Sequence, residues 1–373
     1  MRLTEFLFWL SAAVPLYAYL GYPLFLLLLG SIYKRPAQRA KFEPSVTLLI
    51  PAYNEAEHIA AKIRDSQRLD YPAEKLEILV VCDGSRDATP EIAGQMADGE
   101  RVRVLSFPEN RGKIPVLNDG VRESRGEVVV FSDATALLYP DSVRELLMNF
   151  ADPLVGAVSG RYTVIRADEV GIGKSEDFYW KYETFLKTLE SQLHSMLGAH
   201  GHLHAIRRDL YPYPPSGTIN DDYVIPVSVL AKGYRAVYEP GAVVYEEARE
   251  MSGFGRRVRI MAGNLQQLRE IRGLLRPLRP LPVFFFLSHK LSRLVVPFAM
   301  VAALLANAML LNLPLYRGLF LLQMFFYLLA FTGASLRLRP KLLMLPWYFC
   351  MINAAVFFGI YHALTSRRAM AWK

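Results

Sequence analysis

Four long stretches of the chain contain no charged side chain, and they constrain the fold more than any other feature. They cover residues 6–33, 294–316, 318–336 and 342–366. About 20 apolar residues are enough for a helix to cross the hydrocarbon core of a bilayer. The sequence therefore predicts an integral membrane protein with up to four spanning segments. Residues 1–33 lack a clear small-residue cleavage site before the basic stretch that follows, so we interpret them as a retained anchor.

The net charge of +8 is concentrated beside these apolar stretches. The first is followed at once by Lys34, Arg35, Arg39 and Lys41. Because basic residues flank the cytoplasmic ends of membrane segments, the middle of the chain is predicted to lie in the cytoplasm, below the inner or plasma membrane. The same residues suit contact with anionic membrane lipid. The basic residues at 367–373 would then fall outside, against the rule, unless one C-terminal stretch is interfacial or re-entrant.

These features divide the chain into three parts. We expect a transmembrane anchor at 1–33, a cytoplasmic domain at 34–280, and an interfacial segment with C-terminal transmembrane helices at 281–373. The interfacial segment is predicted from arginines and prolines around three consecutive phenylalanines, Phe284 to Phe286.

The cytoplasmic part alternates strand and helix patterns. Short runs rich in branched apolar residues occur at 45–53, 76–85, 101–107 and 127–134, and a helical pattern covers 55–69. Such runs, with helices between them, predict an α/β fold whose mainly parallel sheet is covered on both faces. In these sheets ligands bind beyond the carboxyl ends of the strands, so the residues after each run are the candidate site.

Polar side chains follow three of the predicted strands. The first strand is followed by Pro51, Tyr53, Asn54 and Glu55, the second by Asp83, and the fourth by Asp133. Each has a structural explanation as a turn or helix cap, but three at one sheet edge indicate a ligand site. The turn after the first strand has no glycine, which argues against a dinucleotide fingerprint. No zinc-finger spacing or other nucleic-acid-binding motif is present, so nucleic acid is not an expected partner.

Five motifs, in order, resemble glycosyltransferase family 2. They are PAYNE, VVCDGSRDAT, NRGKIPVLNDG, VVVFSDAT and TINDDYVIPVSVLAKGYRAVYEP, with GAHGHLHAIRRDL before the last, and together they cover roughly residues 44–265. The resemblance implies a GT-A fold, that of nucleotide-diphospho-sugar transferases. The flanking apolar stretches also resemble those of cellulose and hyaluronan synthases, which act in polysaccharide synthesis.

The resemblance assigns the donor side. It implies that Pro51, Tyr53, Asn54, Glu55 and Asp83 surround the nucleoside, and that Lys113 lies near the phosphates. Asp133 matches the first aspartate of the D-x-D motif and implies a divalent metal, Mg²⁺ or Mn²⁺. Thr135 departs from the second aspartate, so another side chain or water would have to complete the site. A hard divalent cation suits the charge that develops on a leaving diphosphate.

The acceptor side is assigned in the same way. Asp222 matches the family's general base and Asp221 its supporting neighbour, although the pair could also cap the following helix. A base on the face opposite the leaving group implies inversion, from an α-linked donor to a β-linked product. On the donor side, Arg256 and Arg259 occupy the positions of the glutamine and the arginine in the family's Q-x-x-R-W motif, and we expect them to bind the donor because arginine is well suited to bind phosphate. In that motif Ile260 replaces the tryptophan, which argues against processive synthesis.

Three histidines alternate just before this region. Alternation would place His200, His202 and His204 on one face of a strand, an arrangement that could hold zinc. We instead interpret His200 and Gly201 as acceptor-side residues, because this stretch matches a family segment near the acceptor. The overall prediction is an inverting transferase that moves a sugar from a nucleotide-sugar donor to a glycan or lipid-linked acceptor. A processive synthase with a translocation channel and a non-catalytic membrane scaffold are the alternatives.

Overall fold

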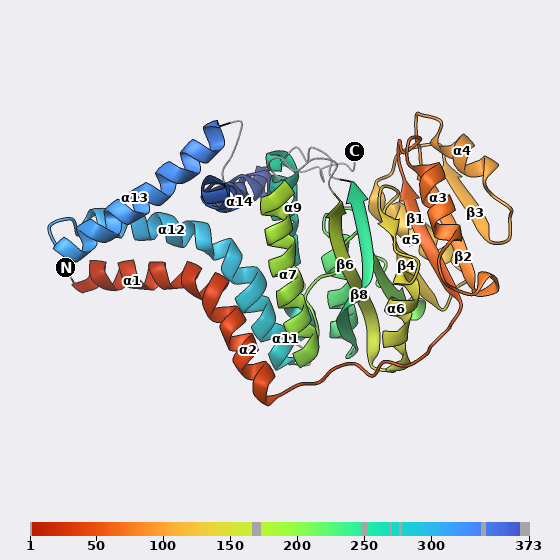
Figure 1. Ribbon diagram of the computed structural model, residues 1–373, viewed down its shortest axis with the longest axis horizontal. Coiled ribbons are helices and arrows are strands. Elements are labelled where there is room, and N and C mark those ends of the chain that lie inside the picture. Colours follow the sequence, from red (N-terminus) through yellow and green to blue (C-terminus); the bar gives the residue numbers. More distant parts are fainter. Residues whose placement is uncertain are drawn as a thin grey trace.

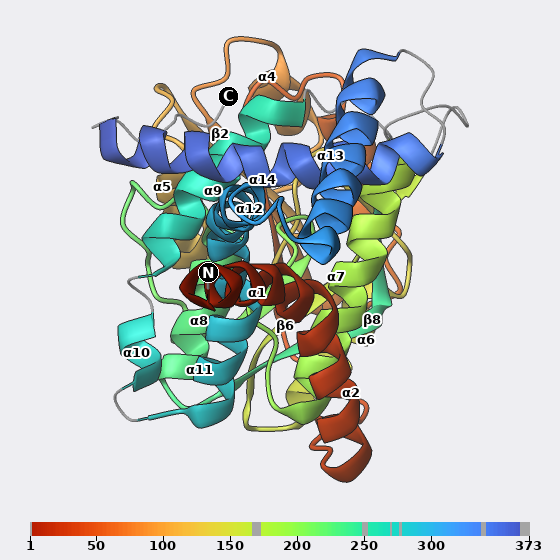
Figure 2. The same ribbon diagram turned by 90° about the vertical axis from the view of Figure 1, so that its left-hand side faces the viewer.

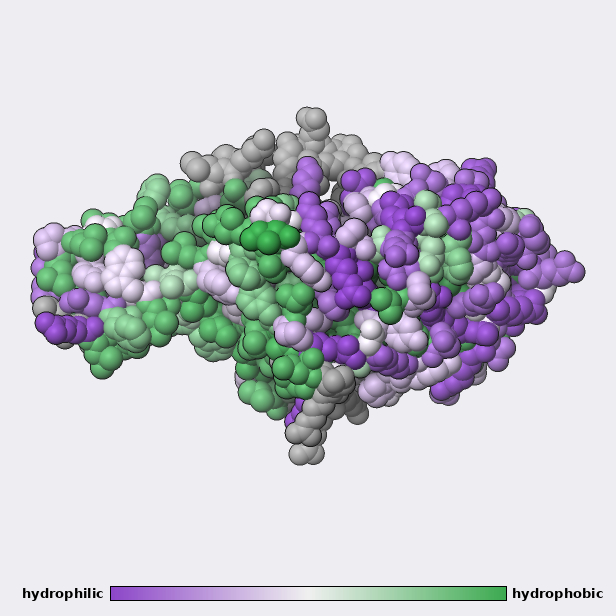
Figure 3. Space-filling view, turned by 90° about the horizontal axis from the view of Figure 1, so that it is seen from below, coloured by the Kyte–Doolittle hydropathy of each residue, from purple (hydrophilic) through white to green (hydrophobic). Residues whose placement is uncertain are grey.

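The protein has a sheet-containing part and a helical part that projects from one side of it (Figure 1). The computed structural model describes residues 2–165, 173–247, 253–268, 271–275, 278–336 and 341–365. The apolar surface gathers on the projecting helices, whereas the surface of the sheet-containing part is mostly hydrophilic (Figure 3). The structure thus has an apolar helical part and a hydrophilic part that contains the sheet.

Within these described ranges the sheet has eight strands, in the order β3-β2-β1-β4-β7-β6-β8-β5. The pairs within β3-β2-β1-β4 are parallel, β6 and β8 are parallel, and the remaining pairs are antiparallel. Every residue of β1 and β2 is buried, as their continuous apolar runs predict. The strand bounds are β1 Val46–Ala52, β2 Leu76–Asp83, β3 Val102–Phe107, β4 Val128–Phe131, β5 Leu137–Leu138, β6 Val155–Ile165, β7 His204–Arg207 and β8 Arg235–Glu247. The mixed, mainly parallel sheet confirms the predicted fold class.

Helices cover both faces of the sheet. One face packs against α3 (Ile59–Gln67), α4 (Thr89–Gln95) and α6 (Ser142–Met148). The other packs against α5 (Lys113–Glu123), α7 (Gly173–Leu193) and α8 (Asp221–Ala231). Two further helices, α9 (Gly253–Gln267) and α10 (Ile271–Leu275), follow β8, and short 3-10 turns cover Ala73–Lys75, Asn149–Ala151 and Arg208–Leu210.

In the part of the chain that the structure describes, four helical segments are long and apolar enough to cross a membrane: Arg2–Ile32, Pro280–Ala308, Pro314–Ser335 and Leu343–Thr365. The first comprises α1 (Arg2–Leu16), a π-helical turn η1 (Tyr17–Gly21) and α2 (Tyr22–Ile32). The second comprises α11 (Pro280–Phe285), a π-helical turn η5 (Phe286–Leu291) and α12 (Ser292–Ala308). The segment expected to lie at the interface is thus continuous with α12. The other two are α13 (Pro314–Ser335) and α14 (Lys341–Thr365).

The helical part and the sheet share one apolar core. Tyr22 and Leu26 of α2 and Phe285 of α11 are fully buried in the cluster that lies on the α5–α7–α8 face of the sheet. The Tyr22 hydroxyl also donates a hydrogen bond to Glu190 of α7, at 2.6 Å. Since these contacts join the apolar helical segments directly to the sheet core, the site described next is held against those helices.

Candidate active site

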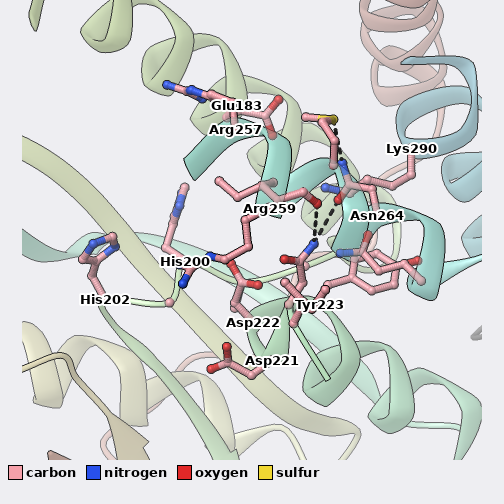
Figure 4. Close-up of a pocket in the computed structure, with 18 of the residues that line it drawn as sticks. Glu183, His200, His202, Asp221, Asp222, Tyr223, Arg257, Arg259, Asn264 and Lys290 are labelled. Carbon is pink, nitrogen blue, oxygen red and sulfur yellow. Dashed lines mark hydrogen bonds between the residues drawn. The ribbon is translucent and has the colours of Figure 1, made fainter. Parts of the chain in front are cut away.

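One cavity of about 950 Å³ connects the sheet edge to the apolar helices. Its lining includes Glu55 and Gly112, the aspartates Asp133 and Asp222, and Ile352 of α14. The carboxyl ends of β1 and β4 open into it, as the topology of a parallel sheet predicts. Figure 4 shows side chains from α7, α8, α9 and η5 that gather around its middle part.

Lys113 joins the two acidic motifs. It is the first residue of α5, and its ammonium lies 3.1 Å from Oδ1 of Asp133 and 3.5 Å from Oδ2 of Asp221. Burial would raise the pKa of Asp133, but Lys113 and then His202 outweigh it and hold that pKa below its usual value. Asp133 is therefore a carboxylate at neutral pH. The sequence motifs place Lys113 and Asp133 near each other only by resemblance, and the structure brings them into contact.

Glu246 was not recognised in the sequence, and it lies beside Asp133. It comes from β8 and accepts a hydrogen bond from the Thr135 hydroxyl at 2.6 Å. Its other carboxylate oxygen lies 3.5 Å from Nε2 of His202, and Oδ2 of Asp133 lies 3.9 Å from the same nitrogen. Hydrogen bonds from His202 and Thr135 overcome burial and lower the pKa of Glu246 to about 2. The carboxylates of Asp133 and Glu246 thus both lie beside His202, although the Asp133-Ala134-Thr135 sequence itself supplies only one of them.

Asp221 and Asp222 begin α8 and point into the middle of the cavity (Figure 4). Acidic side chains in the first turn are stabilised by the helix dipole, so the position is structurally favourable as well as exposed to a ligand. Burial, and then the neighbouring Asp221, raises the pKa of the Asp222 carboxyl. Gly201 lies opposite, and a Cβ there would be 3.9 Å from that of Asp222, so the glycine leaves the carboxylate accessible.

The residues after β1 and β2 form the other end of the cavity. Pro51 and Glu55 line it directly, whereas Tyr53 and Asn54 do not. Asn54 has φ 54° and accepts a hydrogen bond from the backbone N–H of Arg86, so it fixes the turn after β1 against the turn after β2.

Asp83 lies behind the cavity wall. It is fully buried, and its carboxylate accepts hydrogen bonds from the backbone N–H groups of Arg111 and Gly112, at 3.0 and 2.8 Å. Both of those residues line the cavity. In the structure, then, Asp83 fixes the backbone of Arg111 and Gly112 at the cavity wall. A nucleobase could contact the Asp83 carboxylate only if these two residues moved.

The arginine motif on α9 contributes Arg259 and the neighbouring Arg257 to the cavity. Arg257 donates a hydrogen bond to the Tyr348 hydroxyl of α14 at 2.6 Å. The side chain of Arg256 lies outside the described residues, so its predicted role stays a prediction.

The three histidines do not share a strand face. Only His204 belongs to β7, while His200 and His202 lie in the turn before it. His200 packs on Tyr238 and Trp180, and His202 stacks on Tyr162 beside Glu246. The expected strand face was wrong because alternation over five residues does not distinguish a strand from a turn. Within the described residues no group of three or more His, Cys, Asp or Glu side chains could hold a metal ion by itself.

Residues 47–212 match the family model described as Glycosyl transferase family 2. The chain is 26% identical over 230 residues to a Poly-beta-1,6-N-acetyl-D-glucosamine synthase of Staphylococcus aureus, over 60% of this chain and 55% of that protein. It is 27% identical over 215 residues to an N-acetylglucosaminyltransferase of a Rhizobium species, over 54% of this chain and 48% of that protein. The chain thus spans about half the length of the curated relatives it matches.

Among solved structures, the fold is similar to that of the mannosyltransferase PcManGT from Pyrobaculum calidifontis, solved in complex with GDP-Man and Mn²⁺. The TM-score is 0.73 at 25% sequence identity, and the match covers 97% of this chain and 100% of that one. Because nearly the whole chain is covered, the similarity includes the apolar helices as well as the sheet.

Proposed function

We propose that the chain is a glycosyltransferase of family 2, an inverting transferase that moves a sugar from a nucleotide-diphosphate donor to a hydroxyl of a glycan or lipid-linked acceptor. The observation that carries the proposal is the single cavity in which Asp133, Lys113 and Asp222 converge. Relatives named as synthases of an N-acetylglucosamine polymer support a role in cell-surface polysaccharide or glycolipid synthesis.

The chemistry of the side chains at the β4 edge fits a divalent metal. Mg²⁺ and related cations commonly bind one or two protein carboxylates, with substrate phosphates and water in the other positions. Asp133 and Glu246 supply two carboxylates on one wall of the cavity, which explains why no protein cage of three ligands is needed. When bound, such a cation would neutralise the charge of the leaving diphosphate. The Mn²⁺ of the mannosyltransferase complex supports this assignment.

The side chains of the cavity have separate roles in the proposed reaction. Lys113, held by Asp133 and Asp221, supplies fixed positive charge beside the diphosphate. Asp222 takes the proton of the acceptor hydroxyl, since a base must lie within hydrogen-bond reach of the nucleophile. The new bond forms from the acceptor oxygen to the anomeric carbon as the bond from that carbon to the diphosphate breaks. Attack from the face opposite the leaving group gives a β-linked product.

A donor screen tests the proposal. Purified full-length protein in lipid nanodiscs is supplied with Mn²⁺ and with UDP- and GDP-linked sugars in turn, and released nucleoside diphosphate is measured. We expect release with a restricted set of donors and its loss when the metal is chelated. If no donor releases nucleoside diphosphate under any metal, the scaffold interpretation replaces the transferase.

A processive synthase is the second candidate, because the Staphylococcus aureus relative is named for a polymer product. Aromatic side chains that could contact a sugar chain also line the cavity, among them Tyr179, Trp180 and Tyr348. Against it, Ile260 occupies the tryptophan position of the family motif. Product length, measured by mass spectrometry at limiting enzyme, separates single addition from polymer growth.

A further inference from the structure

The cavity continues well past Asp222, into the apolar helices. Beyond the catalytic aspartate its lining includes Leu20 of η1, Leu294 of α12, and Leu345, Ile352 and Val356 of α14. All five belong to segments that are long and apolar enough to cross a membrane. A water-soluble acceptor has little apolar surface to bury against these side chains, whereas the hydrocarbon chain of a lipid would be buried favourably against them.

Two ammonium groups, those of Lys187 and Lys290, line the same cavity and are close enough to Asp222 to oppose the rise that burial causes in the pKa of its carboxyl. Lys187 of α7 is only 4% exposed, and its one hydrogen bond goes to the carbonyl of Ala199, at 3.1 Å. Lys290 of η5 lies 5.7 Å from the centre of the Tyr223 ring (Figure 4). In the described part of the chain neither ammonium has a carboxylate within 4.0 Å. A buried ammonium without an anionic partner is costly, so an anionic ligand would stabilise it.

The acidic side chain at this end is already paired. Glu183 of α7 lines the cavity, but its carboxylate accepts a hydrogen bond from Arg293 and lies 3.4 Å from Nε2 of His289. Its contacts are therefore made with Arg293 and His289 and not with the two lysines. Burial, and then Lys290, lowers the pKa of Lys187 to about 8, although Glu183, Asp222 and Glu190 act in the opposite direction. The surrounding carboxylates thus do not offset the burial of this ammonium and its repulsion by Lys290.

We propose that this end of the cavity binds a lipid acceptor whose phosphate lies between Lys187 and Lys290, whose hydroxyl lies at Asp222, and whose hydrocarbon chains pack against η1, α12 and α14. The inference rests on the proposed glycosyl transfer and names its acceptor class. In the transfer the hydroxyl oxygen bonds to the anomeric carbon, its proton passes to Asp222, and the nucleoside diphosphate leaves with the electron pair of the broken bond. The phosphate of the lipid takes no part in bond formation and only positions the hydroxyl.

Phosphatidylglycerol is the probe, because it carries a hydroxyl, one phosphate and two acyl chains. Full-length protein in neutral detergent is titrated with it, and bound lipid is counted by native mass spectrometry. Diacylglycerol, which has no phosphate, and glycerol phosphate, which has no chain, are titrated in parallel. We expect one tightly bound phosphatidylglycerol per chain and at least tenfold weaker binding of either fragment.

Three variants locate the bound lipid. Lys187→Met and Lys290→Met should each weaken phosphatidylglycerol binding by about tenfold, the size expected for loss of a charge-assisted hydrogen bond. Ile352→Trp fills the apolar end without changing charge and should weaken it as well. Lys181→Met, an exposed position on the same helix α7, is the matched control and should bind as the unmodified protein does.

Two outcomes would overturn the inference. The first is equal binding of diacylglycerol and phosphatidylglycerol, or phosphatidylglycerol binding that both lysine variants retain. The second is one-to-one binding of a soluble oligosaccharide such as chitopentaose that displaces the lipid, which would make the occupant a glycan chain. Release of nucleoside diphosphate is measured on the same samples. Release without lipid binding rejects only the acceptor class, whereas lipid binding without release from any donor rejects the transferase.

Discussion

At position 135 a threonine replaces the aspartate that the family motif leads one to expect, and Glu246 supplies a carboxylate in the same place. We predict that Glu246→Gln raises the Kd for Mn²⁺ by tenfold or more, because one of two hard oxygen ligands loses its charge. Adding Thr135→Asp to that variant should restore much of the affinity. The Kd for Mn²⁺ of each variant is measured by electron paramagnetic resonance, in separate titrations with GDP and with UDP present.

Glu127→Gln is the control for this prediction. Glu127 is exposed and precedes β4, at the opposite end of that strand from Asp133, so its replacement should leave Mn²⁺ binding unchanged. Equal Mn²⁺ affinity in the Glu246→Gln variant and the unmodified protein would show that Glu246 is no ligand and only supports Thr135.

We predict that the acid limb of the pH–rate profile depends on Asp222. Burial and Asp221 raise the pKa of its carboxyl, while Lys187, Lys113 and Lys290 act in the opposite direction. A base must be deprotonated to work, so the transfer rate should fall on acidification at a pH above the ordinary aspartate value of about 3.9. Asp221→Asn removes a negative neighbour and should move that limb to lower pH. A limb that stays in place would assign it to another group.

Motifs identified Asp133 and Asp222 from the sequence because each lies in a short contiguous pattern that follows a strand or begins a helix. Glu246 carries no such signal, since it contacts Thr135 across 111 positions of chain. Lys187 belongs to no motif either. It occupies an ordinary helical position, and only the folded chain shows that its ammonium is buried close to Asp222. Pairings that depend on how distant strands and helices meet cannot be read from local patterns.

At the scale of elements, contacts with α9 fix the start of α8, which carries Asp221 and Asp222. Gly263 of α9 packs on Asn220, the residue before α8, and a Cβ at 263 would come within 2.5 Å of that side chain. Asn220 also donates hydrogen bonds to the carbonyl of Ile260 and to Asn264 of α9. These contacts hold Asp221 and Asp222 against the arginine-bearing helix.

We predict that Gly263→Ala lowers kcat by tenfold or more, because Asn220 must shift and carry the start of α8 with it. Gly255→Ala on the same helix is the matched control, since nothing lies within 4 Å of its Cβ position. Thermal unfolding of both variants should be similar. Loss of activity in both, or in neither, would contradict the coupling of α9 to α8.

At the scale of the whole molecule, α14 does not run with the other apolar helices. Figure 1 shows α1 and α13 lengthwise and α14 almost end-on, and Figure 2 shows α14 lengthwise across the molecule. It packs against α9, where a Cβ at Gly359 would come within 2.6 Å of Met261. A helix that crosses the direction of the spans beside the catalytic part has the geometry of an interfacial helix.

We propose that three segments span and that α14 lies on the cytoplasmic face of the membrane. This topology removes the conflict in the charge pattern, because the basic residues at 367–373 then join those at 34–41 in the cytoplasm. The sequence predicts the apolar stretches correctly, but hydropathy alone cannot distinguish a span from an equally apolar helix lying flat.

Labelling of introduced cysteines in intact cells measures this topology. Asn312→Cys, between α12 and α13, should react with a membrane-impermeant maleimide from outside. Thr365→Cys, at the end of α14, should react only after the cells are permeabilised. Labelling of Thr365→Cys in intact cells would mean that α14 crosses the membrane. A variant without Cys82 and Cys350 provides the background.

The central claim is that one cavity binds a nucleotide-sugar and that Asp222 deprotonates the acceptor within it. Asp222→Asn tests it most directly, because the substitution keeps the size of the side chain and removes the base. We predict a fall in transfer rate of about a thousandfold, with nucleoside diphosphate still bound in the presence of Mn²⁺. Transfer by Asp222→Asn at the rate of the unmodified protein would contradict the mechanism.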